Sequence, residues 1–150
     1  MKMKKILKYA LVAAALVSCH KLEYPPQDSS CTLNSMKCLV YYDADNLRKY
    51  YELDVLGGGT YNESLGAVSY TFPSDASMYN SETLRRCRLE LTVPATARVV
   101  EVDAAGNETG SGISGMRDLN STTVYFKVIA ADGTEKQYQA RFRVNRENME

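Results

Sequence analysis

The sequence predicts an all-β domain, built as a sandwich of two antiparallel sheets. Apolar and polar side chains alternate with a period of two rather than 3.6 over most of the chain, which is typical of half-buried strands. Clusters of Gly, Pro, Asn, Asp and Ser separate these alternating runs and predict turns between them. No stretch keeps a helical pattern for three turns, so strands dominate the prediction.

The segment RCRLELTVP, residues 86–94, alternates most regularly. Its even-numbered positions carry arginine, glutamate and threonine, which belong in water. Its odd-numbered positions carry the side chains expected to face a core: Cys87, Leu89, Leu91 and Val93.

The two last strands form a predicted hairpin. TTVYFKVIAADG, residues 122–133, and KQYQARFRV, residues 136–144, both alternate, with Phe126 and Phe142 on the inward faces. Asp132-Gly133 lies between them, and an Asp-Gly pair between two alternating runs is a strong hairpin signal.

Four further strands are expected at 35–42, 49–55, 66–72 and 97–103. The total of seven short strands in about 110 residues is typical of an immunoglobulin-like antiparallel sandwich. A small β-barrel is the alternative architecture.

The strand end LELTVP, followed by RDLNSTTVYFKVIAADGTEKQYQARFRV, resembles a known group of domains. These are the immunoglobulin-like domains of unknown function in surface lipoproteins of the Bacteroidetes. The resemblance covers residues 87–144, is not clear over 31–73, and implies an extracytoplasmic, often glycan-associated lipoprotein without catalytic residues. The matching positions are Thr92, Val93, Pro94, Asp118, Tyr125, Val128, Ala130, Asp132, Gly133 and Tyr138.

The amino-terminal residues have the pattern of a secretory signal peptide, with four lysines before an apolar run at 9–17. That run is much shorter than the roughly 20 residues of a membrane-spanning helix. Residues 16–19, LVSC, resemble the bacterial lipobox, which implies cleavage before Cys19 and lipidation of its side chain and new amino group. The predicted organisation is a lipoprotein signal peptide at 1–18, a lipidated tether at 19–30, a sandwich at 31–146 and a tail at 147–150.

Several acyl chains on Cys19 would hold the protein stably on a membrane, which is the first predicted partner. His20 follows the cysteine, not the aspartate that retains some lipoproteins in an inner membrane, so an outer membrane is favoured, with either leaflet open. Residues 20–30 can span roughly 35 Å when extended. Cleavage leaves 14 basic and 18 acidic residues, a net charge of −4 that gives no support to nucleic-acid binding.

Three cysteines follow the anchor, at Cys31, Cys38 and Cys87. Alternation places Cys38 and Cys87 on inward faces, where they are either free buried thiols or partners in a disulfide. No cysteine spacing matches a zinc site, so no metal is predicted.

The sequence gives no support to catalysis, because His20 is its one histidine and no base is available for a nucleophile. We therefore expect no catalytic residues and no cofactor. The leading hypothesis is a lipid-anchored binding or adhesion module for polysaccharide or an outer-membrane protein. A structural or assembly subunit of a pilus or outer-membrane complex is the second, and an enzyme working without histidine the third.

Tyr41 and Tyr50 are the predicted ligand-binding residues. A hairpin through residues 43–48 would set them opposite each other on the outward face of two paired strands. An exposed aromatic pair suits sugar rings or a protein partner. The alternative is an ordinary cross-strand pair that stabilises the hairpin and binds nothing.

Overall fold

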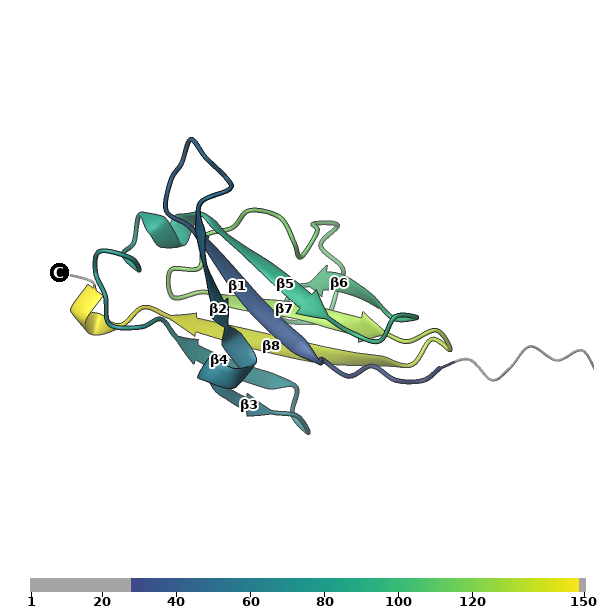
Figure 1. Cartoon of the computed structure of the whole chain (residues 1–150). Helices are drawn as coiled ribbons and strands as arrows, with labels where there is room; N and C mark the ends of the chain where they lie inside the picture. The colour runs from purple at the N-terminus through teal and green to yellow at the C-terminus, as the bar shows by residue number, and fades with distance from the viewer. Residues whose placement is uncertain (1–27, 149–150) are drawn as a thin grey trace, which may run out of the picture.

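The computed structural model describes residues 28–148, which form two sheets packed face to face (Figure 1). One sheet has the order β2-β1-β5, from Tyr50–Asp54, Ser35–Tyr41 and Cys87–Thr92. The other has the order β3-β4-β8-β7-β6, from Thr60–Asn62, Ala67–Thr71, Glu135–Arg143, Thr123–Ile129 and Arg98–Val102. The predicted β-sandwich is confirmed, and the barrel alternative is wrong because the sheets stay separate.

All seven predicted strands are present, and an eighth, β3, lies in a segment expected to be a flexible turn. The glycines before β3 make a tight turn instead. The short helix α2 (Val55–Gly58) follows β2, and the Asp54 carboxylate accepts a 2.9 Å hydrogen bond from the Gly57 backbone N–H. A side chain at Gly59 would lie 2.4 Å from the carbonyl oxygen of Ser69, so this turn requires glycine.

The expectation of purely antiparallel sheets is wrong at one place. Strands β4 and β8 pair in parallel, with Tyr70 opposite Phe142. Parallel neighbours cannot be joined by a hairpin, and here β5, β6 and β7 intervene between them in the chain.

Aromatic side chains fill much of the space between the sheets. Phe126 stacks on Tyr138 at 5.3 Å between ring centroids, and Phe142 stacks on Phe72 at 6.1 Å. Predicted burial is confirmed for Phe126 and Phe142, whereas Leu91, one residue before the end of β5, is only half-buried.

The sandwich has two ends, which Figure 1 shows on the right and the left. The end that holds Asp28, the first described residue, is called the near end, and the opposite one the far end. The Asp28 carbonyl oxygen accepts a 3.2 Å hydrogen bond from the Asp132 N–H in the β7–β8 hairpin. The far end holds the 42–49 loop, the 3-10 helices η1 (Thr83–Arg85) and η2 (Arg146–Asn148), and the 118–122 loop. No helix within residues 28–148 is long and apolar enough to span a membrane.

Candidate functional site

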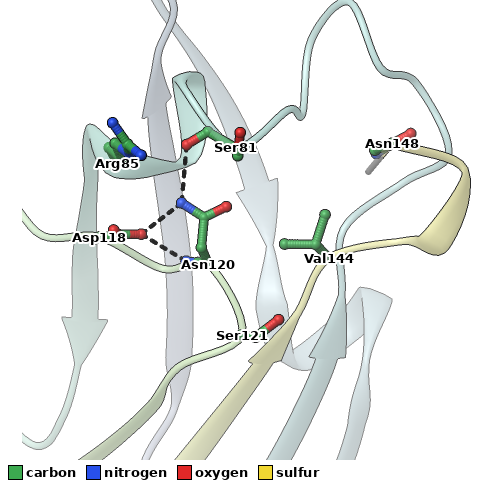
Figure 2. Close-up of a pocket in the computed structure, with 7 residues that line it drawn as sticks. All are labelled: Ser81, Arg85, Asp118, Asn120, Ser121, Val144 and Asn148. Carbon is green, nitrogen blue, oxygen red and sulfur yellow. Dashed lines mark hydrogen bonds between the residues drawn. The ribbon is translucent and has the colours of Figure 1, made fainter. Parts of the chain in front are cut away.

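A pocket of about 310 Å³ opens at the far end, between the segment that carries η1, the 118–122 loop and the end of β8 (Figure 2). That volume lies at the lower end of the range for small-molecule sites. The residues that line it are of polar types apart from Val144: Ser81, Arg85, Asp118, Asn120, Ser121 and Asn148.

Asn120 is the most firmly held side chain of the pocket. Its backbone N–H and its Nδ2 both donate to Oδ1 of Asp118, at 2.9 and 2.6 Å. Nδ2 also donates to the carbonyl oxygen of Ser81 at 2.9 Å, so both amide hydrogens are engaged. The side-chain amide oxygen of Asn120, Oδ1, points toward Val144 in Figure 2 and is left as a fixed acceptor.

Ser121 follows in a left-handed conformation, with φ of 50°. Among residues 28–148 it is the one non-glycine residue with positive φ, a conformation that costs a non-glycine residue about 1 kcal/mol or more and recurs at functional sites. The turn is held in place because the next residue, Thr122, accepts a 2.8 Å hydrogen bond from the Phe142 N–H. The Ser121 hydroxyl oxygen points into the pocket in Figure 2.

Two further residues give the pocket a cation and a buried acceptor. Arg85 is exposed, and no carboxylate in residues 28–148 lies within 4.0 Å of its guanidinium. Asn148 is 5% exposed and donates from Nδ2 to the Pro73 carbonyl oxygen at 2.7 Å. Its Oδ1 is buried with no donor in the described chain, an arrangement that is rare in native proteins.

The pocket therefore offers fixed acceptors, hydroxyl groups and a guanidinium beside the apolar surface of Val144. These groups can exchange hydrogen bonds with a hydroxylated ligand while its C–H face contacts valine.

The predicted Tyr41–Tyr50 pairing is confirmed, but the predicted exposure of Tyr41 is wrong. The two residues lie opposite each other on β1 and β2, with ring centroids 5.6 Å apart. Tyr50 is 42% exposed, whereas Tyr41 is 4% exposed because Tyr50 covers it from one side and Arg88 from the other. An exposed aromatic pair is therefore not formed.

The structure describes Cys31, Cys38 and Cys87 as free thiols, the last two fully buried. The Cys87 thiol donates to the Leu84 carbonyl oxygen at 3.3 Å. A hydrogen bond with the Cys87 side chain, together with burial, raises the pKa of the Cys38 thiol far above its ordinary value of 9.0. A Cys38–Cys87 disulfide stays a prediction for oxidised protein.

Other predictions fall outside the described residues. These are the signal peptide at 1–18, lipidation of Cys19 and most of the tether. At the other terminus, η2 continues the described fold into the predicted tail, as far as Asn148.

Pattern analysis missed the far-end pocket because alternation identifies strands and says nothing about loop side chains. The spacing of Asp118 and Asn120 is the signal that could have found part of it. An Asp side chain that accepts from the backbone two residues on is a common turn.

No family model and no curated protein matches the chain. A solved structure of a protein described as secreted, from Bacteroides fragilis NCTC 9343, is similar with 17% sequence identity and a TM-score of 0.49. The match covers 81% of this chain and 100% of that one. A likeness of this size carries no information about ligand or location, so the resemblance to Bacteroidetes lipoprotein domains stays a prediction.

Proposed function

We propose that the protein is an exported, lipid-anchored, non-catalytic binding module that holds polysaccharide at its far end. The observation that carries this proposal is the position and chemistry of the far-end pocket. Its hydrogen-bonding groups lie at the end of the sandwich opposite Asp28, which belongs to the predicted tether at 19–30. A ligand at the far end would thus meet the protein away from the membrane.

The chemistry of the pocket supports a sugar unit more than an apolar ligand. Asn120 is held by three hydrogen bonds before any ligand arrives, which reduces the entropy lost on binding. Sugars present hydroxyl groups that both donate and accept, and the pocket supplies both kinds of partner beside one apolar contact.

Polysaccharide retention tests this function. The wild-type protein should be retarded in gels that contain a polysaccharide it binds, and the double variant Asn120→Ala, Ser121→Gly should lose most of that retardation. Glycine adopts the φ of 50° without strain, so the variant removes hydroxyl and amide while favouring the same turn. Lys136→Gln, on β8 toward the near end, is the control. Loss of retardation in the control alone would contradict the proposal.

The anchor is tested separately. Cys19→Ala should leave unlipidated precursor and move the protein from the membrane to the soluble fraction of its cells. The intact mass of wild-type protein should equal a chain that begins at Cys19 plus its acyl chains. A wild-type mass without acyl chains would end this part of the proposal.

One observation favours the second function, a structural or assembly subunit. The hydrogen bond from the Tyr41 N–H to the Arg86 carbonyl oxygen shows that even-numbered residues of β5 bond to β1, so odd-numbered ones face the sheet edge. There Cys87 exchanges two hydrogen bonds with Arg117, at 3.0 and 2.8 Å. Leu91, which is half-buried, has no backbone partner at that edge within residues 28–148, whereas Leu89 is fully buried.

Such an edge can accept a strand from another protein. Crosslinking in intact cells, followed by purification of the lipoprotein, should then recover a stoichiometric partner. Replacing Leu91 with proline should remove that partner, because proline has no N–H to donate.

A further inference from the structure

We infer that Arg86 and Arg88, with Tyr41 and Tyr50, form an oxyanion site on the outer face of the three-stranded sheet, which takes the acidic group of a charged sugar. This inference rests on the proposed polysaccharide binding and names the class of polysaccharide. The site lies at the far-end half of that sheet. It adjoins the pocket in the sequence, since Arg85 lines the pocket and Arg86 is the next residue.

Arg88 is held above an aromatic ring. Its guanidinium carbon lies 5.6 Å from the centroid of the Tyr41 ring, within the range of a cation–π contact. Tyr50 flanks the same ring, with its plane tilted by 56°. Tyr41 is thus a positioning residue, and Tyr50, which is 42% exposed, is the aromatic surface that a ligand can touch.

Arg86 is fixed by the backbone of the same tyrosine. Its Nε–H donates to the Tyr41 carbonyl oxygen at 3.2 Å, and the Tyr41 N–H donates to the Arg86 carbonyl oxygen at 2.9 Å. The hydrogen bond to Nε leaves the two terminal nitrogens of this guanidinium available for a ligand.

Neither arginine has a carboxylate partner in the described part of the chain. The ion pairs within residues 28–148 engage Lys37, Lys49, Arg117 and Lys127, and none involves Arg86 or Arg88. Nε of Arg88 is moreover buried with no acceptor in the described chain. The positive charges of Arg86 and Arg88 are thus without a counterion in the described chain, which an oxyanion at their guanidinium groups would supply.

The charge on this face is divided between its two halves. Toward the near end, Lys37 on β1 pairs with Glu52 on β2 at 2.8 Å and stands opposite Glu90 on β5, so the acidic side chains lie around a lysine. Next toward the far end, Leu39 on β1 lies between Glu52 and Arg88, and Glu52 is already paired with Lys37. The last position across these strands holds Tyr50, Tyr41 and Arg86, with no acid among them. The unpaired positive charge is therefore local, although the mature chain is acidic overall.

Guanidinium groups bind carboxylate, sulfate and phosphate oxygens through paired N–H donors, and tyrosine offers a flat surface to the C–H face of a sugar ring. The shared chemistry of the ligand is an oxyanion carried on a sugar. A uronic acid and a sulfated sugar are its two sources.

Affinity electrophoresis in three polymers separates these sources. Polygalacturonate presents carboxylates, dextran sulfate presents sulfates, and dextran is neutral. Wild-type protein should be retarded by at least one acidic polymer, more weakly as salt rises, since the contact is ionic. The double variant Arg86→Gln, Arg88→Gln should weaken that binding about tenfold or more, because it removes two charge-assisted contacts.

Two variants serve as controls. Arg141→Gln with Arg143→Gln removes the same charge from exposed positions on the outer face of the five-stranded sheet and should leave binding unchanged. Arg88→Lys keeps the charge but loses the fork, so it should weaken polygalacturonate binding while the melting temperature stays near that of wild type.

Three results would overturn the site: no retardation by either acidic polymer, equal loss in the Arg141/Arg143 control, or unchanged binding in the Arg86/Arg88 variant. If dextran still binds through the far-end pocket in any of these cases, the proposed function stands and the oxyanion site alone fails. If none of the polymers and no other polysaccharide binds, the proposed function fails as well.

Discussion

Phe142 shows how single side chains hold the two sheets together. It is 1% exposed and contacts Phe72 and Tyr70, with ring centroids 6.1 and 6.3 Å away. Its neighbour Arg143 points from the opposite face of β8 into solvent. Two adjacent residues thus have opposite roles, which follows from the alternation of side chains along a strand.

Phe142→Ala should lower the free energy of unfolding by about 3 to 5 kcal/mol, because it deletes a ring from a packed interior. Arg143→Ala should change it by about 0.5 kcal/mol or less. Chemical denaturation of both variants measures the difference, and similar effects would mean that the face of β8 is wrongly assigned.

At the scale of elements, the connection between β6 and β7 is long but fastened. Arg117 makes two hydrogen bonds to the Glu101 carboxylate, at 3.0 and 2.9 Å, and a third to the Ile113 carbonyl oxygen at 3.0 Å. The two side chains are 16% and 18% exposed, so water screens this ion pair less than the others.

Arg117→Ala should therefore destabilise the protein by about 1 to 3 kcal/mol and speed amide exchange through residues 110–117. Lys37→Ala breaks the exposed ion pair with Glu52 and should have an effect below about 1 kcal/mol. Amide exchange by mass spectrometry compares the two. Unchanged protection of 110–117 in Arg117→Ala would show that backbone pairing alone holds the loop.

The strands were predictable where one face is buried and the other wet. The burial of β8 alternates residue by residue, as the sequence of KQYQARFRV indicates. Strand β3 was missed because three residues beside a run of glycines carry too little pattern to separate an edge strand from a turn. Tyr41 was placed on the correct face, but alternation cannot show that Arg88 and Tyr50 cover it. The pocket depends on loops brought together from residues 81 to 148, which no local pattern reveals.

At the scale of the whole molecule, acidic turns make stability depend on pH. The pKa of the Asp103 carboxyl lies below its ordinary value of 3.8, chiefly because the Asn107 backbone N–H donates to it. The pKa of the Asp132 carboxyl is lowered in the same way by Thr134. The pKa values of Asp43 and Asp75 are also lowered by hydrogen bonds within their turns.

A lowered pKa in the folded state contributes stability above the ordinary value and loses it as the pH falls through the folded value. The melting temperature should hence hold from neutral pH to about 4 and fall below 3.8. Asp103→Asn should flatten part of that acid decline. An unchanged acid profile in this variant would exclude Asp103 as a contributor.

The alkaline side depends on buried tyrosine. Burial raises the pKa of Tyr70 from 10.0 to about 12. A raised pKa in the folded state leaves stability intact below pH 10 and removes it as the pH rises toward 12. Tyrosinate absorbance should consequently show the Tyr70 side chain ionising together with unfolding, and Tyr70→Phe should shift unfolding to higher pH. Ionisation of all tyrosines before unfolding would contradict the burial of Tyr70.

The proposed function divides the molecule into an end held at the membrane and an end that meets the ligand. Amide exchange of unlipidated Cys19→Ala protein, with and without the polysaccharide that retards it, measures this division directly. We expect slower exchange at the far end, in residues 42–49, 81–88 and 118–122, and no change in the near-end turns at 62–66, 93–97 and 130–134. Protection confined to the near-end turns would contradict the proposed function.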